Sequence, residues 1–138
     1  MEKFDLSRYL GTWHEIARVR NDFEPEMTDV TAEYSLCRDG SIRVVNSGYV
    51  NGKLKQITGV AEPTGDNGVL NLSFFPGIIS EYRILFVDPN YQTALVGGSD
   101  KNYLWILSRT KKIDKECLER MIILAAEGGY NVENLIIS

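Results

Sequence analysis

The sequence predicts an all-β fold: an eight-stranded antiparallel up-and-down β-barrel with one C-terminal α-helix packed on its outside. Eight short runs in which apolar and polar residues alternate follow one another at near-regular spacing between residues 11 and 110. The turns between these runs are short and rich in Gly, Asn, Asp and Pro. From Asp114 onward the apolar period becomes that of a helix. Short strands joined by tight turns favour a meander that closes into a barrel.

The composition fits a single domain over residues 1–138. With 43% hydrophobic and 25% charged residues, the chain is long enough to bury a core of its own. The net charge of -4 and the scattered distribution of the 15 Lys and Arg residues argue against a nucleic-acid partner. No apolar run approaches the ~20 residues that span a bilayer. The first residues lack the apolar segment of a signal peptide, so the chain as written is expected to be soluble and unexported.

The first strand is expected over residues 12–20. Residues 4–10 predict a short turn or helical cap in which Asp5 accepts backbone hydrogen bonds, and Gly11 then releases the chain into the strand. Alternation places one set of side chains on the inner face and His14, Ile16, Arg18 and Arg20 on the outer face. The inner set is Trp13, Glu15, Ala17 and Val19.

Turn residues then separate the remaining strands. Residues 21–29 form a solvated loop with Pro25 and four acids, whereas the Asp39-Gly40 and Asn51-Gly52 pairs are strong signals of tight hairpins. Residues 63–68 and 88–90 are turns by composition. The other strands are expected at 30–37, 41–50, 53–62, 69–75, 81–87, 91–96 and 103–110.

A helix is expected over residues 114–127. Asp114 is a candidate N-cap, and Gly128-Gly129 is a C-cap pair. The apolar stripe that should pack on the barrel consists of Cys117, Leu118, Met121, Ile122 and Ala125. Residues 134–137 predict a last short strand that could pair with the edge of the sheet.

The interior of an eight-stranded barrel is either filled by side chains or open to one small ligand. Several residues on the expected inner faces are small, which favours a lined cavity. The candidate ligand-binding residues are Ala17, Val19, Tyr34, Val44, Asn46, Lys55, Ile57, Leu72, Phe74, Tyr82, Ile84, Phe86, Leu95, Tyr103 and Trp105.

Three motifs resemble those of the lipocalin family in order and approximate spacing. They are Gly11-x-Trp13, the turn Asp88-Pro89-Asn90-Tyr91, and Arg109 late in the eighth strand. The stretches at 9–18, 34–36 and 103–110 look most like the bacterial lipocalins, relatives of apolipoprotein D, and the similarity covers nearly the whole chain.

This resemblance implies a calyx that binds a fatty acid, phospholipid or lysophospholipid for transport or storage, with no cofactor. Gly11, Trp13 and Arg109 would form its closed end, where Arg109 stacks on the indole. Bacterial members are often outer-membrane lipoproteins that face the periplasm, which would apply here if a leader had been trimmed. His14 stands where the family more often has Tyr.

Several polar and apolar residues have more than one interpretation. Glu15 could contact a ligand or transfer protons, or it could be hydrogen-bonded to a Tyr or a water. Lys55 could meet a ligand head group near Tyr82 and Tyr103, or it could extend into solvent. The loop 74–79, placed at the open rim, could contact a membrane surface or a second copy through Phe75, Ile78 and Ile79, or it could cover the mouth.

The sequence favours binding over catalysis. His14 is the only histidine, so neither a His-based metal site nor a Ser-His-Asp or Cys-His pair is expected. Cys37 and Cys117 are interpreted as small, partly buried residues, with one long-range disulfide as the alternative. Two rival functions stay open: an isomerase-like enzyme that uses Glu15 in the calyx, and a partner-docking module with a vestigial cavity.

Overall fold

The computed structural model describes residues 3–19 and 27–137. Arg20, and most of the loop predicted at 21–29, lie outside these residues. The described elements are α1 (Leu6–Tyr9), β1 (Gly11–Val19), β2 (Thr28–Leu36), β3 (Ile42–Val50), β4 (Lys53–Pro63), β5 (Val69–Phe75), β6 (Ile78–Val87), β7 (Thr93–Gly97), β8 (Leu104–Ser108), α2 (Lys115–Glu127) and β9 (Leu135–Ile137). Neither helix is long and apolar enough to cross a membrane.

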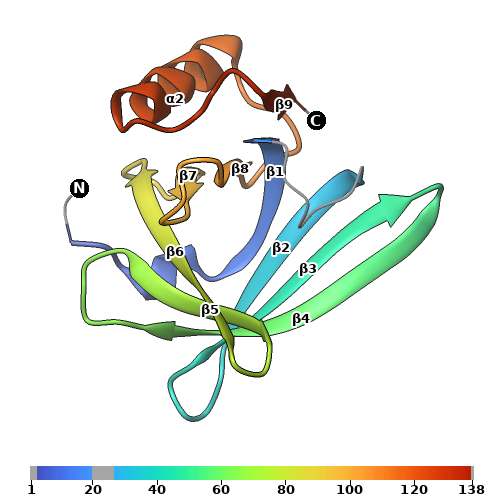
Figure 1. Cartoon of the computed structure of the whole chain (residues 1–138), viewed down its shortest axis with the longest axis vertical. Coiled ribbons are helices and arrows are strands. Elements are labelled where there is room, and N and C mark those ends of the chain that lie inside the picture. Colours follow the sequence, from blue (N-terminus) through green and yellow to red (C-terminus); the bar gives the residue numbers. More distant parts are fainter. Residues whose placement is uncertain (1–2, 20–26, 138) are drawn as a thin grey trace.

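Strands β1 to β8 form the predicted closed antiparallel barrel. Each strand from β2 to β7 pairs with the next one along the chain, and β1 closes the circle by pairing with both β8 and β2. Figure 1 shows this barrel with α2 lying across its outside. The expected eight-stranded meander with one C-terminal helix is therefore confirmed.

Strand β1 divides one of its edges between two partners. Its first part, from Gly11 to His14, pairs with β2. Its last part, from Ala17 to Val19, pairs with β9 instead. Strand β9 therefore pairs with the part of β1 that lies beyond the described pairing with β2. The predicted last strand lies at this edge of the sheet.

The turns follow their sequence signals. Asn51 and Gly52 both have positive φ, at 52° and 77°, as a two-residue type I′ hairpin requires. At the turn before β7, one carboxylate oxygen of Asp88 accepts hydrogen bonds from the backbone N–H groups of Gln92 and Thr93, each at 2.7 Å. These turns fix the register of the strands that line the interior.

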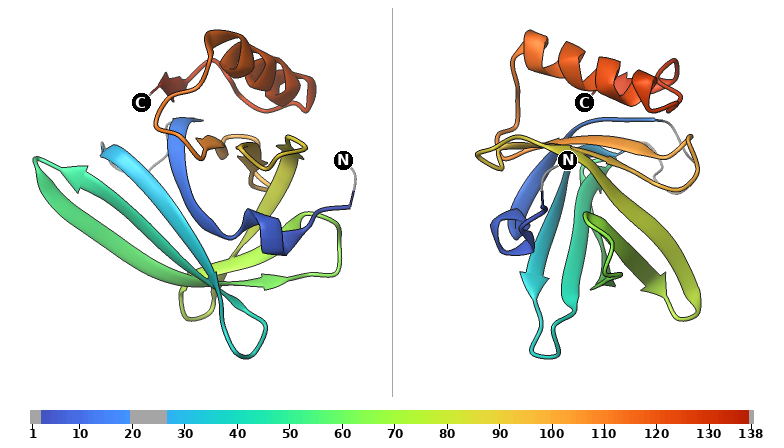
Figure 2. Two further views of the ribbon diagram at one scale, coloured as in Figure 1. Left: turned by 180° about the vertical axis from the view of Figure 1, so that it is seen from behind. Right: turned by 90° about the vertical axis from the view of Figure 1, so that its left-hand side faces the viewer.

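Helix α2 lies against the outer surface of the barrel, as Figure 2 shows from two sides. Met121 and Ala125 are fully buried there, in one cluster with Leu104 and Ile106 of β8. Asp114 holds the N-cap position but makes no side-chain capping hydrogen bond. Both cysteines are free thiols.

Two β-bulges reverse the facing of side chains that alternation had placed inside. The register shifts between Glu15 and Ala17, so that Ala17 lies opposite Ile106 of the helix-side cluster. It shifts again between Ile84 and Phe86. The bulges make the predicted inward facing wrong for Ala17, Val19 and Phe86, which pack on the helix side instead. Leu95 packs there too, because the sequence assigned the wrong phase to β7, which pairs with β8 without a register shift.

The β1 bulge also brings Arg18 inside. Arg18 lies opposite Trp105, which lines the interior, and cross-strand neighbours share a face of the sheet. The sequence had placed Arg18 on the outer face. Strand β6 also begins earlier than expected, at Ile78, so that Pro76-Gly77 is the tip of a tight hairpin in which Phe75 pairs with Ile78.

Candidate functional site

One end of the barrel is sealed by Trp13. Its side chain is fully buried, and its Nε1–H donates a hydrogen bond of 2.7 Å to the carbonyl of Tyr9. The Arg109 guanidinium carbon lies 3.8 Å from the centre of the indole ring. The structure thus brings Trp13 and Arg109 together, although Trp13 lies on β1 and Arg109 directly follows the end of β8 rather than lying within the strand.

Arg109 ties the N-terminal segment to the end of the barrel. Its guanidinium donates to the carbonyls of Arg8, Leu10, Thr12 and Tyr91 at 2.9 to 3.2 Å. Burial lowers the pKa of the Arg109 guanidinium from its ordinary value. Gly11 has φ +103°, and a Cβ there would lie 3.3 Å from Arg109 Nη1, so both backbone and space favour glycine.

Three tyrosines form the floor of the barrel above Trp13. The Tyr82 hydroxyl lies 2.5 Å from that of Tyr9 and 2.8 Å from that of Tyr34. The Tyr9 ring packs between Trp13 and Phe4, with ring centres 4.9 and 5.3 Å away. Burial and the neighbouring phenols raise the pKa of Tyr9 and of Tyr82 well above the ordinary value, so these two phenols keep their protons at neutral pH.

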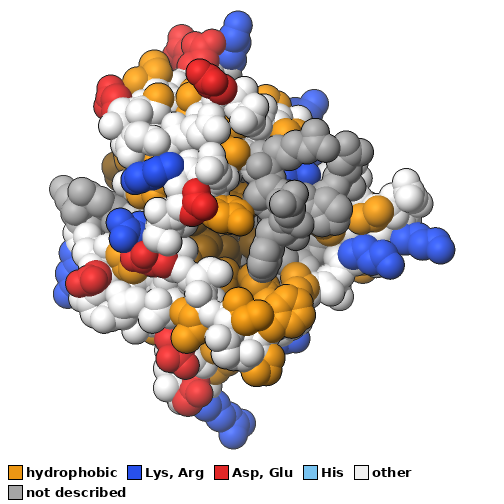
Figure 3. Space-filling view, in the orientation of Figure 1, with side chains coloured by type: hydrophobic (Ala, Val, Ile, Leu, Met, Phe, Trp, Pro, Cys, Tyr) orange, Lys and Arg blue, Asp and Glu red, His pale blue; other side chains and the backbone are white. Residues whose placement is uncertain are grey.

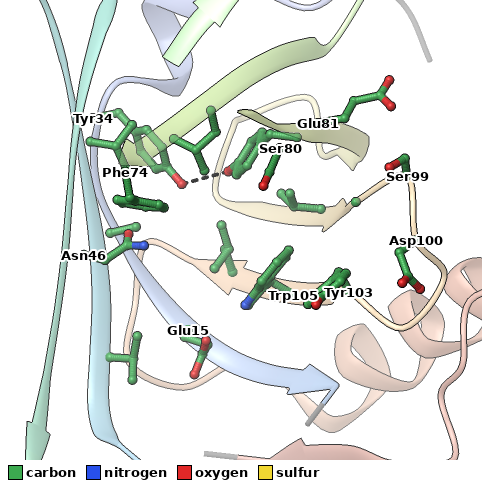
Figure 4. A pocket seen from close by; sticks show the side chains of 18 of the residues that line it. Glu15, Tyr34, Asn46, Phe74, Ser80, Glu81, Ser99, Asp100, Tyr103 and Trp105 are labelled. Carbon is green, nitrogen blue, oxygen red and sulfur yellow. Dashed lines mark hydrogen bonds between the residues drawn. The ribbon is translucent and has the colours of Figure 1, made fainter. Parts of the chain in front are cut away.

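Above the floor lies a cavity of about 350 Å³. Figure 4 shows side chains from β1, β2, β3, β5, β6 and β8 around one space, and Figure 3 shows apolar side chains inside a hollow on this face. The apolar lining consists of Val30, Ala32, Val44, Leu72, Phe74, Ile79, Val96, Trp105 and Leu107. A volume of this size lies in the range of small-molecule sites.

A buried ion pair forms part of the wall. Glu15 lines the cavity, and its Oε2 accepts a hydrogen bond of 2.7 Å from Arg18 Nη1. Both side chains are almost completely buried, at 2% and 4% exposure. The sequence left open a ligand contact, proton transfer, or a hydrogen bond to a tyrosine or a water for Glu15. It did not predict the ion pair with Arg18, which forms because the bulge turns Arg18 inward.

The mouth of the cavity is polar on one side. Ser80 and Glu81 of β6 lie there with Ser99, Asp100 and Tyr103 of the loop between β7 and β8. The rings of Tyr103 and Trp105 stack at 6.3 Å. Glu81 also bonds to Arg83 at 2.9 Å. Within the described parts of the chain, the charged residues that line the cavity are all acidic.

The opposite side of the rim is apolar. Phe75, Ile78 and Ile79 of the β5–β6 hairpin expose between 51% and 67% of their surface. Figure 3 shows apolar side chains gathered at the lower rim of the hollow, over this hairpin. We call these three residues the rim patch.

The structure places eight of the candidate ligand-binding residues on the cavity wall: Tyr34, Val44, Asn46, Leu72, Phe74, Tyr82, Tyr103 and Trp105. Ile84 is buried in the barrel core without lining the cavity, and Ile57 is half-buried opposite Asn46. Lys55 is exposed near the β3–β4 turn and does not reach the cavity. Ala17, Val19, Phe86 and Leu95 lie on the helix side.

Sequence reasoning missed several lining residues. Val96 was missed because the inner face of β7 was assigned to Leu95, whereas Val96 lies opposite Trp105 and lines the cavity. Ser80, Glu81, Ser99 and Asp100 carry no motif, and only the tertiary structure brings their two segments to one mouth. In the described ranges 3–19 and 27–137, no cluster of three or more His, Cys, Asp or Glu could hold a metal.

Residues 4–138 match the family described as a lipocalin-like domain. The chain belongs to the lipocalin family. The outer membrane lipoprotein Blc of Citrobacter freundii is 43% identical over 140 residues, 99% of this chain and 79% of the relative. Apolipoprotein D of Mus musculus is 28% identical over 97% of this chain and 76% of its own. The predicted resemblance is thus confirmed.

The fold of this lipocalin agrees with a solved structure. Insecticyanin from the tobacco hornworm Manduca sexta superposes with a TM-score of 0.79, covering 99% of this chain and 80% of the other. The two sequences are only 23% identical, so this similarity shows the shared fold alone. Lipocalins bind small hydrophobic ligands, which fits the position of the cavity inside the barrel.

Proposed function

We propose that this lipocalin binds a small lipid inside the barrel and carries or stores it without catalysis. The observation that supports this most directly is the cavity of about 350 Å³, which has a mainly apolar wall and a sealed floor. Transfer of an apolar chain from water into such a space is favourable by ~25 cal/mol per Å² of buried surface. The cavity therefore supplies the free energy of binding through its shape and its apolar lining.

The ligand class that we propose is a fatty acid, phospholipid or lysophospholipid. An acyl chain suits the apolar wall, and a head group would stay at the mouth with Ser80, Ser99 and Tyr103. Glu81 and Asp100 at the same mouth favour a head group that carries an ammonium, because opposite charges attract there in partly exposed surroundings. Among these lipids, a zwitterionic lysophospholipid fits the mouth better than a free fatty acid.

Ligand displacement from a delipidated sample tests the proposal. A dansylated fatty acid should gain fluorescence on binding, and lysophosphatidylethanolamine should displace it. Ala32→Trp should lower the affinity for both, since Ala32 lines the cavity. Ala126→Trp places the same side chain on an exposed position of α2 and should leave affinity unchanged. Equal affinities in the two variants would place the ligand outside the barrel.

The contacts of Glu15 in the cavity wall support binding of the lipid without turnover. Glu15, the acid considered for an isomerase-like reaction, is engaged by Arg18 inside the wall. Native mass spectrometry of the protein purified without added lipid checks this point. A retained lipid of unchanged mass supports carriage, whereas a chemically altered lipid after incubation contradicts it.

We also propose that the rim patch contacts a membrane surface as the ligand enters or leaves. Its three side chains are large, apolar and adjacent to the mouth. Ile78→Ser should reduce co-sedimentation with phospholipid vesicles, and Ile123→Ser, at an exposed position of α2, serves as the control. If Ile78→Ser instead converts a dimer to a monomer in sedimentation velocity, the patch is a contact between copies.

For localisation, we propose the periplasmic side of the outer membrane. The support is the name of the Citrobacter freundii relative, an outer membrane lipoprotein. Fractionation of cells that express the gene from its own locus tests this assignment. Recovery in the cytosolic fraction would overturn it.

A further inference from the structure

We propose that the floor of the cavity is a polar subsite that takes a hydroxyl or carbonyl oxygen at the inner end of the ligand chain. The subsite is centred on the Tyr82 hydroxyl. This inference rests on the proposed function, because it concerns the ligand of the same cavity. It adds a preference for chains that are oxygenated at the end which enters first.

The Tyr82 hydroxyl has more hydrogen-bonding positions than the floor uses. A phenolic hydroxyl donates one hydrogen bond and can accept two. The Tyr82 hydroxyl contacts two groups within the floor, the hydroxyls of Tyr9 and Tyr34. These two contacts use two of the three hydrogen-bonding positions of the hydroxyl, which leaves one for a ligand. Tyr82 also lines the cavity.

The surroundings of Tyr9 give the direction of the bonds. Tyr9 is completely buried, with its ring against Phe4 and Trp13 and its hydroxyl on Tyr82. A buried donor without a partner is costly, so Tyr9 donates its proton within the floor, where the Tyr82 hydroxyl lies 2.5 Å away. Because Tyr82 lines the cavity, its remaining position is assigned to the cavity side, where an alcohol can pair with it as donor or acceptor.

The charges of the wall select a neutral oxygen at this depth. Within the described residues, Glu15, Glu81 and Asp100 are the charged groups of the lining, and Arg18 is bonded to Glu15. A carboxylate at the floor would lose its hydration among apolar side chains and phenols, and the guanidinium of Arg18 is already paired with Glu15. A hydroxyl or carbonyl loses far less on entering and regains a hydrogen bond from the floor.

A matched pair of fatty acids tests the subsite. Lauric acid and its ω-hydroxy derivative share the carboxylate and the chain, and they differ only at the end that would reach the floor. Both are titrated against a dansylated fatty acid on the delipidated protein. We expect the ω-hydroxy acid to bind wild type at least as tightly as laurate, since its hydroxyl is paired at Tyr82.

Two variants test whether the Tyr82 hydroxyl sets the affinity ratio of the two acids. In Tyr82→Phe the affinity ratio of the ω-hydroxy acid to laurate should fall roughly tenfold, the value of one hydrogen bond. Tyr103→Phe removes a phenol at the mouth of the same cavity and should leave the ratio unchanged. The subsite is overturned if the affinity ratio of the ω-hydroxy acid to laurate is as low in wild type as in Tyr82→Phe.

The outcomes separate this inference from the proposed function. If neither acid nor lysophosphatidylethanolamine displaces the dansylated probe, the proposed function fails. If both bind but the ω-methylene protons of the ω-hydroxy acid show no nuclear Overhauser contact with the Tyr82 ring, only the subsite fails. Near-ultraviolet circular dichroism checks the fold of Tyr82→Phe. If that variant does not fold, the nuclear Overhauser contact between the ω-methylene protons and the Tyr82 ring in wild type tests the subsite.

Discussion

Arg109 is the residue that connects the first segment of the chain to the last strand of the barrel. Its four hydrogen bonds reach α1, β1 and the turn before β7, and its plane lies on Trp13. Arg109→Ala leaves four carbonyls without this donor and removes the cation–π contact. We expect a loss of about 2–3 kcal/mol in the free energy of unfolding, measured by urea denaturation.

Ligand affinity should hardly change in the same variant, because Arg109 lies below the floor and does not line the cavity. Arg109→Lys is the informative control. Lysine keeps the charge but cannot reproduce the planar fork of donors, so most of the loss should remain. A lysine variant as stable as wild type would show that the charge alone matters at this end of the barrel.

The floor tyrosines predict a loss of stability at alkaline pH. Burial, followed by the neighbouring phenols, raises the folded-state pKa of Tyr9 and Tyr82 above the ordinary value of 10.0. Their contribution is fully present below that pH, and it declines as pH rises toward the folded-state pKa. Between pH 10 and the folded-state pKa, each tyrosine that stays protonated in the folded state but ionises on unfolding should lower the free energy of unfolding by about 1.4 kcal/mol per pH unit.

Tyr9→Phe isolates one of these protons. Urea midpoints of wild type and variant, compared from about pH 8 to 11, should converge as pH rises, because the variant has one phenol fewer to ionise on unfolding. Parallel curves would contradict the assignment. Lys and the exposed groups titrate equally in both proteins and cancel in the comparison.

At the scale of elements, helix α2 is held on the barrel by few side chains. Met121 is 1% exposed and sits in the apolar cluster between the helix and β8. Met121→Ala should cost about 2–5 kcal/mol in the free energy of unfolding, because it opens a cavity in that cluster. Ile123→Ala, on the exposed face of the same helix, should stay within about 0.5 kcal/mol of wild type.

The order and type of the elements could be predicted from the sequence, because turn chemistry and alternation are local signals. The Asn51-Gly52 hairpin and the stripe around Met121 are examples. The two bulges could not be predicted, since one extra residue in a strand leaves no mark on the polarity pattern. The bulges moved Ala17, Val19 and Phe86 to the helix side and brought Arg18 to Glu15. The facing of Leu95 was wrong for another reason, because polarity alone did not give the phase of the regular strand β7.

At the scale of the whole molecule, the apolar residues form two clusters on opposite sides of one wall. One cluster fills the closed end of the barrel around Trp13, and the other lies between the barrel and α2. No residue of the second cluster lines the cavity, so a ligand bound there would contact the first cluster only. Laurate at about a hundred times its Kd should therefore add about 2.7 kcal/mol of stability to wild type.

The same increment should appear in Met121→Ala, because sites without shared partners contribute additively. Thermal melts of both proteins with and without laurate measure the two increments. A clearly smaller increment in the variant would show that the helix supports the cavity through the shared wall.

The shared edge of β1 has a consequence for synthesis on the ribosome. The first strand to emerge is also the strand whose last part, from Ala17 to Val19, is paired by the last strand, β9. Translation must therefore pass residue 137 before that stretch of backbone gains its partner. A product that terminates early would carry an open strand edge there, and such edges recruit other chains.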